Sequence, residues 1–414
     1  AAPVTPPEAA SCSFTAADLA GTQGAPLTQE IRALAAKLEY SPARIFEHVY
    51  NTIEFQPYYG SLKGAMGTLY TKAGGPTDQA SLLIALLRAS NVPARYVRGT
   101  VYVMDGAPAG AEGRGPKWIG AKSYAAAASI LSQGRFSAGT VNSPAQGIGL
   151  GHVWVEACVP YAHYRGARLD NTGHRWIPLD PSFKDKTYKQ GIATGVPFDY
   201  TNFLAARGTQ LPHEKYADQV RAALPANASL EDVPYQGTIK PRKLDILPAS
   251  LPYIVAAFNN WPGTASPEAA ELPDSHRYKL SVSGAGLTAP FIASLPQTAL
   301  QRITLAFKGA TPADQSALDA WRTAQDATTL PTCAATVNVV PAIRVEGVDQ
   351  GVAGSALALC SANNTLTLTV TLGELSSPTI NTVTYTNIGA ANHHALQAYA
   401  FQASDRLLTE RAAR

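Results

Sequence analysis

The chain lacks several features that would place it in a class at once. It has no segment near eighteen consecutive apolar residues, so the sequence predicts no membrane span. Only 15% of its 414 residues are charged, the formal net charge is +3, and no run of five or more like charges occurs. Charge this sparse and scattered gives no reason to expect a nucleic-acid partner. The glycines around Lys63 lack the spacing of a phosphate-binding loop.

Cysteine is scarce, and its spacing argues against two common kinds of site. The four residues, Cys12, Cys158, Cys333 and Cys360, include no C-x-x-C pair, so we expect no zinc ribbon and no redox motif. We also expect no cofactor. The even count permits two disulfides in three connectivities. Cys333–Cys360 is the most plausible pair because both residues lie in one β-rich region, which leaves Cys12–Cys158. Four free thiols are the alternative.

The first residues indicate where the protein acts. The stretch AAPVTPPEAAS is typical of the end of a removed export signal followed by a proline-rich lead. Disulfides persist in oxidising compartments. We therefore predict a secreted, periplasmic or cell-surface location.

The chain length suggests two or three domains. We predict an extended lead over residues 1–27, an α+β domain over 28–250 and a β-rich domain over 251–414. Residues 104–150 are a glycine-rich and proline-rich insertion, interpreted as a lid over a site. Regularly spaced β-like segments after residue 251 predict antiparallel strands, interrupted by a helix over 312–325. The final helix, predicted over 392–411, ends without a C-cap, so further domains beyond it are one interpretation.

The stretch 74–99 contains the clearest local signal. It reads as a glycine turn, a core helix with apolar residues at i, i+3, i+4 and i+7, a short turn and a strand. Pro76 suits the first position of the helix, and Asp78 lies in its first turn. Two more helices are predicted before it, over 28–38 and 41–53. Residues 55–75, between them and the core helix, are predicted to be an ordered loop.

Three motifs in sequence order then suggest a family. The helix ending LLRASNVPARYVRG, the strand GHVWVEA and the strand WIPLDPSF resemble the transglutaminase-like core, a branch of the papain-like cysteine hydrolases and transferases. The resemblance covers roughly residues 40–185. The run YNTIEFQPYYGSLKGAMGTLYTKAGGPTDQASLLIALLRA more particularly resembles the transglutaminase-like region of bacterial RHS/YD-repeat-associated proteins. The implied fold is α+β: a helix packed on an antiparallel sheet, followed by an antiparallel β-rich domain.

The resemblance implies a catalytic pair. In the family a cysteine at the helix N-terminus is the nucleophile, a histidine on the next strand is its base, and an aspartate on the following strand orients the histidine. His152 matches the histidine and Asp180 matches the aspartate. The family cysteine lies twelve residues before the arginine of the helix ending, which here is Arg88, and that position is Pro76. Cys158 is six residues from His152 along one strand, roughly 20 Å away, and cannot replace it.

Other polar residues near the lost nucleophile leave alternatives open. Asp78 either caps its own helix or faces His152 as an acid for general acid–base chemistry. Asp78, Glu156 and Asp180 together could hydrolyse a glycoside or bind a cation. Thr77 is a better candidate for a hydroxyl nucleophile than Ser81, although such residues usually cap helices.

Aromatic residues suggest a binding groove. Tyr59, Trp154 and Trp176, with Glu156, could line a cleft for a peptide, protein or glycan; the simpler interpretation is core and rim packing. Two hypotheses follow. The first is an exported binding or structural module whose transglutaminase-like domain has lost its cysteine. The second is a hydrolase of peptide or polysaccharide that uses His152, Asp180 and Asp78 without a thiol.

Overall fold

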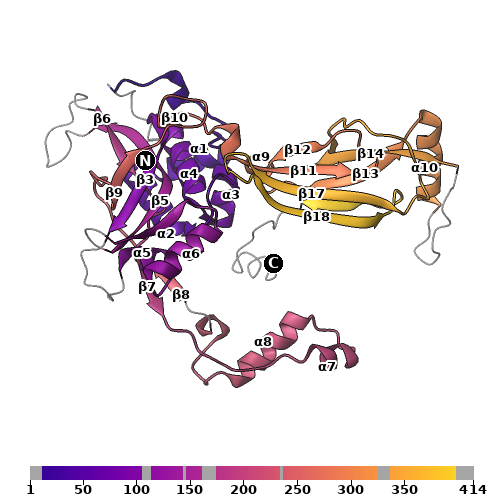
Figure 1. Cartoon of the computed structure of the whole chain (residues 1–414), viewed down its shortest axis with the longest axis horizontal. Coiled ribbons are helices and arrows are strands. Elements are labelled where there is room, and N and C mark those ends of the chain that lie inside the picture. Colours follow the sequence, from indigo (N-terminus) through magenta and orange to yellow (C-terminus); the bar gives the residue numbers. More distant parts are fainter. Residues whose placement is uncertain are drawn as a thin grey trace.

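The computed structural model describes residues 12–104, 113–142, 146–160, 174–233, 236–324 and 336–397. Two bodies lie side by side in Figure 1: a helix-and-sheet body formed by the first part of the chain, and an elongated β-rich body formed by the last part. A small helical arm projects from the first body. The mixture of helices with antiparallel sheets confirms the predicted α+β class.

The first body is built on one antiparallel sheet with strands of different lengths. Its two long strands are β3 (Ala94–Met104) and β5 (Gly147–Pro160), which pair from Ala94↔Ala157 to Met104↔Gly147. The strands that extend it are β4 (Ala138–Val141) and β6 (His174–Leu179) beside β5, and β9 (Ile254–Phe258) and β10 (Glu268–Ala269) beside β3. The predicted strands over 96–103, 152–158 and 175–180 are confirmed as β3, β5 and β6.

Helix α4 (Pro76–Ala89) is buried along its whole length, as the apolar spacing in this stretch predicts. Against it pack α1 (Gln29–Lys37) and α2 (Pro42–Thr52), which begin where the sequence predicts. Thr28 and Ser41 cap these two helices by accepting hydrogen bonds from backbone N–H groups three residues later.

The prediction of a loop over 55–75 is wrong. This stretch contains α3 (Gly64–Thr71), and it is flanked by a short parallel pair, β1 (Glu54–Phe55) with β2 (Ala73–Gly74). Helix α3 has no amphipathic pattern because it is buried on several sides, so no periodicity signals it. The N-terminus of α3 is held by Asp78, from α4, which no local motif reveals.

The described part of the insertion over 104–150 is packed into the body, so it is not a free lid. It contains α5 (Arg114–Ile119), α6 (Tyr124–Gln133) and β4, and α6 confirms a short helix that the sequence predicts over residues 122–131. Trp118 and Leu131 are buried in the core. Residues 105–112 and 143–145 lie outside the described part of the chain.

The second body consists of two antiparallel sheets. One contains β12 (Phe291–Ser294), β11 (Tyr278–Gly284), β17 (Asn364–Leu372) and β18 (Thr379–Ile388). The other contains β15 (Val348–Asp349), β14 (Asn338–Val345), β13 (Ile303–Gly309), β19 (His394–Gln397) and β16 (Leu357–Ala358). Helices α9 (Leu295–Thr298) and α10 (Pro312–Thr323) complete it, and α10 confirms the helix predicted there.

Two expectations about the second half need correction. The stretch after 251 was expected to lie in the β-rich domain, but β9 and β10 pair with β3 of the first sheet. We therefore propose a division nearer residue 273. The helix predicted over 392–411 is also wrong at its start, where β19 pairs with β13. Residues 398–414 lie outside the described range.

The remaining elements form the arm. The strands β7 (Lys186–Lys189) and β8 (Gln236–Ile239) pair and lead to α7 (Tyr200–Ala205) and α8 (Pro212–Ala223). These two helices confirm the short helices that the sequence predicts over 203–207 and 216–224. Among the described residues, 3-10 turns lie at Ala16–Asp18, Leu230–Asp232 and Asp274–His276. Across the described ranges, no helix is both long enough and apolar enough to cross a membrane.

Cys12 and Cys158 form a disulfide, as predicted, with their Cα atoms 6.2 Å apart. It ties the N-terminal segment to β5. Cys360 is also disulfide-bonded, and its predicted partner, Cys333, lies outside the described residues. Four free thiols are therefore excluded, and Cys158 has no thiol to offer His152.

Candidate functional site

His152 and Asp180 meet as the sequence predicts. His152 lies on β5 and Asp180 directly follows β6, so the pairing of the two strands brings the residues together. The Nε2 atom of His152 is 2.8 Å from Oδ2 of Asp180. Asp180 also accepts hydrogen bonds from the backbone N–H and the hydroxyl of Ser182, each at 2.7 Å, and from the Tyr253 hydroxyl at 3.0 Å.

The environment of Asp180 favours its charged form. Burial raises the pKa of this carboxyl, but His152 and the two Ser182 bonds lower it by more than burial raises it. The pKa is therefore below the ordinary value of 3.8. The same burial, together with the charge of Asp180, raises the pKa of Tyr253 well above its usual value. Tyr253 therefore remains a hydrogen-bond donor to Asp180. No local motif indicates this role of Tyr253, because the residue lies 73 positions after Asp180.

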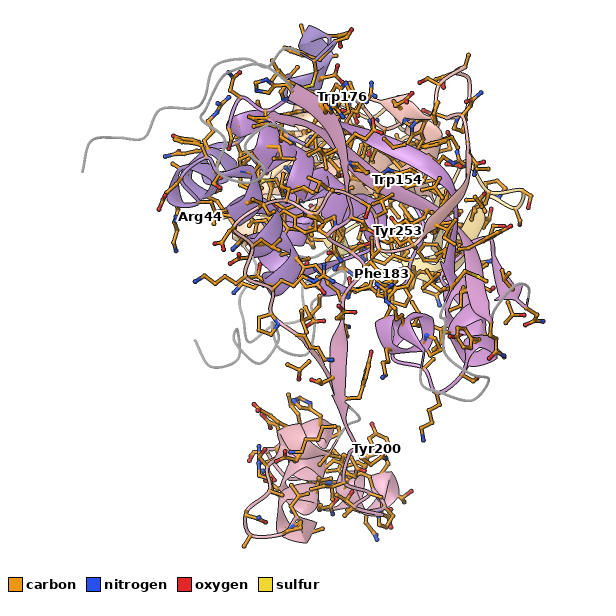
Figure 2. All side chains as sticks on the ribbon, turned by 90° about the vertical axis from the view of Figure 1, so that its left-hand side faces the viewer. Arg44, Trp154, Trp176, Phe183, Tyr200 and Tyr253 are labelled. Carbon is orange, nitrogen blue, oxygen red and sulfur yellow. A yellow bond between two sulfur atoms is a disulfide. The ribbon has the colours of Figure 1, made fainter. Side chains whose placement is uncertain are left out.

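Aromatic rings cover the pair. The rings of Trp118 and Tyr253 each make a T-shaped contact with the imidazole of His152, with ring centroids 5.8 and 5.4 Å away. Phe183 packs 5.8 Å from Tyr253, and Figure 2 shows these two rings together beneath Trp154. His152 is 1% exposed and Asp180 is 5% exposed. The pair is thus closed to solvent.

The Nδ1 atom of His152 has no described nucleophile within reach. This atom is buried and has no hydrogen-bond partner among the described residues. In a nucleophile–histidine–carboxylate arrangement this nitrogen would take the proton of the attacking group. No described hydroxyl or thiol lies within bonding distance of it.

The N-terminus of α4 is also closed. Gly75 is its N-cap and Pro76 is its first residue, and Pro76 is buried. An added Cβ at Gly75 would lie 2.6 Å from the carbonyl oxygen of Tyr58, so the segment before α3 packs directly on this helix start. The start of α4 is therefore a packed backbone with no reactive side chain at Pro76.

Asp78 has a role that neither interpretation predicted. It is fully buried and accepts hydrogen bonds from the Tyr58 and Ser61 hydroxyls, both at 2.7 Å. It also accepts three backbone N–H bonds, at 2.8 to 3.0 Å, from Leu62, Lys63 and Gly64. Asp78 therefore caps α3 instead of its own helix, and both of its oxygens are occupied. No described bond links it to His152, so the expected acid–base pairing is not observed.

The four predicted binding residues do not line one cleft. Trp154 is 1% exposed and packs against Phe258, 5.9 Å between ring centroids. Glu156 forms an ion pair with Arg95 at 2.7 Å, and the Arg95 guanidinium lies over Trp176 at 4.1 Å from the ring centroid. Tyr59 lines a different, open pocket. The proposed carboxylate set of Asp78, Glu156 and Asp180 is likewise dispersed, because each carboxylate is engaged elsewhere. In the described part of the chain, no group of three or more His, Cys, Asp or Glu is placed to hold a metal.

A second histidine makes a hydroxyl–imidazole–carboxylate chain that the sequence did not reveal. The Thr77 hydroxyl is 3.1 Å from Nε2 of His276, and Nδ1 of His276 is 2.5 Å from Oε2 of Glu374. Arg98 and the Tyr59 hydroxyl hold the other oxygen of Glu374. Thr77 and His276 are both buried. The three members are 199 and 98 positions apart, so no motif could link them.

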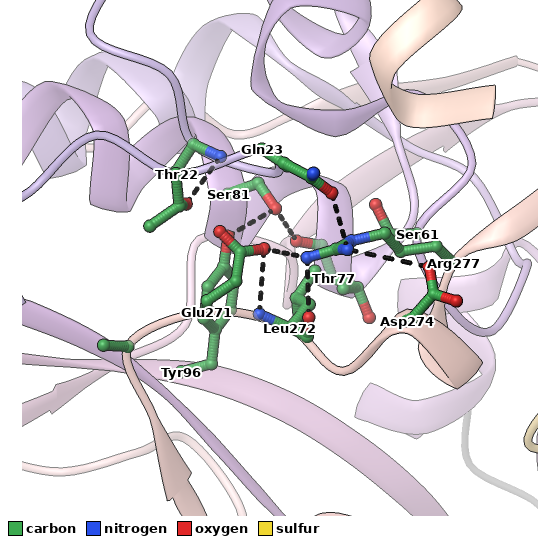
Figure 3. A network of polar contacts seen from close by, with 12 residues as sticks. Thr22, Gln23, Ser61, Thr77, Ser81, Tyr96, Glu271, Leu272, Asp274 and Arg277 are labelled. Carbon is green, nitrogen blue, oxygen red and sulfur yellow. Dashed lines mark hydrogen bonds and ion pairs between the residues drawn. The ribbon is translucent and has the colours of Figure 1, made fainter. Parts of the chain in front are cut away.

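The Thr77–His276–Glu374 contacts lie beside a polar network at the junction between the two bodies. Figure 3 shows this network. Arg277 donates to Gln23 at 2.8 Å and to the carbonyl of Leu272 at 2.6 Å, and it forms an ion pair with Glu271. Tyr96 donates to Ser81, which donates to the carbonyl of Thr77. The network joins the N-terminal segment, α4 and the junction segment, so its members are structural.

A helix packed on an antiparallel sheet, with a histidine on one strand and an aspartate after the next, is the arrangement that the sequence resemblance implied. The family model of the transglutaminase-like superfamily matches residues 25–181, which hold α1 to β6 and both members of the His152–Asp180 pair. This part of the chain is a transglutaminase-like domain. Neither the curated proteins nor the solved structures include one that matches the chain.

Proposed function

We propose that this protein is an exported binding or structural module, built on a transglutaminase-like domain that no longer catalyses a reaction. The observation that carries the proposal is the state of His152. Its Nδ1 atom faces no nucleophile, its ring is covered by Trp118 and Tyr253, and Pro76 occupies the position of the family cysteine. Three separate changes would be needed to recover thiol chemistry: a thiol, an opening and a path for substrate.

In this proposal the His152–Asp180 pair serves the fold. A buried carboxylate that accepts four hydrogen bonds fixes the end of β6 against β5 and the segment that carries Tyr253. Polar networks satisfied in this way specify one packing arrangement, since any slip of the strands leaves a buried charge unpaired. Retention of the pair thus has a structural reason that does not require turnover.

Export and bacterial context belong to the same proposal. The Cys12–Cys158 disulfide and the bonded state of Cys360 suit an oxidising compartment outside the cytoplasm. The resemblance of the run before Arg88 to RHS/YD-repeat-associated proteins supports a role as part of a larger surface or secreted system. A peptide, protein or glycan is the proposed class of ligand.

Returning a thiol to Pro76 tests the closed site. We expect Pro76→Cys to react slowly with iodoacetamide and to incorporate no labelled amine into casein, because the new thiol is buried and His152 is covered. The matched control is Pro76→Ser, which has similar size and no thiol. Amine incorporation by Pro76→Cys that is lost in Pro76→Cys/His152→Gln would overturn the proposal, since it would reveal a working base.

A hydrolase remains the second candidate function, and the Thr77–His276–Glu374 chain favours it. A hydroxyl at the start of α4, next to an imidazole that is oriented by a carboxylate, has the order of groups used by hydroxyl nucleophiles. Burial of Thr77 and His276 opposes it. Hydrolysis of p-nitrophenyl acetate or labelled casein that is lost in Thr77→Val but kept in Thr209→Val, an exposed control, would replace our first proposal with this one.

A further inference from the structure

A pocket of about 670 Å3 lies between the sheet of the first body and the loop after β17. Arg98, Thr100 and Tyr102 of β3 line it, with Gly149 and Gly151 of β5. His152 follows Gly151 on a strand, so its side chain points to the other face of the sheet. The pocket is therefore separate from the His152–Asp180 pair. Its volume falls in the range of pockets that bind small ligands.

The floor of this pocket is a patch of sheet with few side chains. Gly151 pairs with Thr100, and Gly149 pairs with Tyr102 on one side and with Gly139 of β4 on the other. A Cβ added at Gly139 or Gly151 would meet no atom within 4 Å. Glycine inside a strand often marks a place where another molecule approaches the backbone closely. The floor is therefore open to a flat ligand at Gly139 and Gly151, whereas the side chains of Tyr102 and Val141 already lie over Gly149.

The floor offers little to a peptide. Along residues 147–150, β5 is paired with β3 on one side and with β4 on the other, so this strand already uses its backbone hydrogen-bonding groups, and of the three strands only β4 presents a sheet edge. A peptide strand that augments a sheet needs unpaired backbone groups at an edge. A sugar ring needs only a flat surface and hydrogen-bonding side chains around its rim.

The rim supplies such side chains and a positive charge. Arg135 is exposed and lines the pocket, and within the described part of the chain its guanidinium makes no ion pair or hydrogen bond. Its φ of 70° is unusual for a residue other than glycine. The neighbouring residue, Gly134, is fixed because its carbonyl accepts the Tyr59 N–H at 2.8 Å. Asn259 donates to the Thr100 hydroxyl at 3.0 Å, which leaves its carbonyl oxygen as an acceptor.

The one carboxylate in the pocket is already neutralised. Glu374 is held by Arg98, His276 and Tyr59, and these contacts bring its pKa below the ordinary value of 4.5 despite its burial, which raises it. The charged residues of the lining are thus two arginines against one paired glutamate. The free charge is the guanidinium of Arg135.

We propose that this pocket binds an acidic oligosaccharide, with a sugar ring on the glycine floor and a ring carboxylate on Arg135. The proposal rests on the binding role proposed above and names its ligand class. Guanidinium and carboxylate groups pair through two parallel hydrogen bonds, which gives Arg135 the means to select a uronic acid over a neutral sugar.

Oligogalacturonate binding, measured by isothermal titration calorimetry, tests the assignment. We expect binding to the wild-type protein, no detectable binding of neutral maltohexaose, and weaker binding at higher salt. Arg135→Gln should weaken binding by about tenfold or more, because it removes the charge from the paired hydrogen bonds to the carboxylate. Gly151→Leu should abolish it by filling the floor, and it should leave the fold intact because the added side chain enters open space. Arg207→Gln, an exposed arginine of the arm, should change nothing.

Three outcomes would overturn the assignment: no binding of oligogalacturonate, equal binding of maltohexaose, or unchanged binding by a folded Gly151→Leu protein. Tighter binding of polyglutamate than of oligogalacturonate would do the same and would favour an acidic peptide. Circular dichroism establishes that each variant is folded. None of these results bears on the Pro76→Cys experiment, so failure of the ligand class is distinguishable from failure of the proposed loss of catalysis.

Discussion

Two buried aspartates of the transglutaminase-like domain have different structural roles. Asp78 accepts five hydrogen bonds, three of them from the backbone at the start of α3. Asp180 accepts four, one of them from His152. Both were candidates for acid–base chemistry on sequence alone. Their hydrogen bonds instead indicate that each aspartate stabilises the fold.

The role of Asp78 predicts a large loss of stability from a small change. Asp78→Asn replaces one acceptor oxygen with a donor, so several buried groups at the start of α3 lose their partner. We expect the free energy of unfolding to fall by about 3 kcal/mol, as measured by urea denaturation. Asp218→Asn, on the exposed face of α8, should change it by less than about 0.5 kcal/mol. A stable Asp78→Asn protein would contradict the capping role.

The lowered pKa of Asp180 predicts how stability depends on pH. A carboxyl whose pKa is lower in the folded than in the unfolded state stabilises the fold above its unfolded pKa, near 3.8, and this contribution is lost as pH falls through the folded value. Asp180→Asn should therefore lower the free energy of unfolding by about 3 kcal/mol at pH 7. The gap in unfolding free energy between wild type and variant should narrow below pH 3.8. Urea denaturation at pH 7, 4 and 3 measures the gap, and a gap that widens towards pH 3 would contradict this account.

At the scale of elements, the sequence predicted those whose signals are local. α1 and α2 have capping residues, α4 has apolar spacing with Pro76 at its start, and the long strands are rich in β-branched and aromatic residues. The missed element, α3, is buried on several sides and capped by a distant aspartate. The sequence predicts a strand at β9 but none at β10. Which sheet β9 joins depends on tertiary packing, which a single sequence does not encode locally.

The Cys12–Cys158 disulfide is the element-level bond with the largest predicted effect. It closes a loop of 146 residues, and long loops lose much conformational entropy in the unfolded state when they are cross-linked. Cys12→Ser/Cys158→Ser should lower the free energy of unfolding by about 2–5 kcal/mol in urea denaturation. Equal stability of the double variant and the wild type would contradict a stabilising role for this bond.

At the scale of the whole molecule, the two bodies share one buried polar junction. Glu374, in the loop between β17 and β18, contacts Arg98 and Tyr59 of the first body and His276 of the segment that joins the bodies. The same loop forms one wall of the pocket assigned to an acidic oligosaccharide. The junction therefore couples the position of the β-rich body to the shape of the pocket.

That coupling predicts the behaviour of Glu374→Gln. Removal of the charge leaves Arg98 without its carboxylate partner, which should lower the free energy of unfolding by about 3 kcal/mol. We expect differential scanning calorimetry to resolve two transitions where the wild type has one, because the bodies then unfold separately. Glu231→Gln, on an exposed turn of the arm, is the control. A single, unshifted transition for Glu374→Gln would contradict the coupling.

The site could be predicted from the sequence only in part. The contact of His152 with Asp180 followed from the motifs on two neighbouring strands. The assignment of Pro76 to the family nucleophile position rests on counting back from Arg88 and stays a proposal. The covering of His152 by Trp118 and Tyr253 could not be predicted, because these residues come from an insertion and from a segment about 100 positions later. The chain through Thr77 and His276 is equally non-local.

The central claim is that His152 supports the fold and catalyses nothing. Its most direct test compares turnover by the wild-type protein with turnover by His152→Gln, using labelled casein with and without an amine acceptor. His213→Gln, an exposed histidine of α8, controls for the substitution. We predict no turnover above background for any of the three proteins. Turnover by the wild type and by His213→Gln that is absent in a folded His152→Gln protein would contradict the claim.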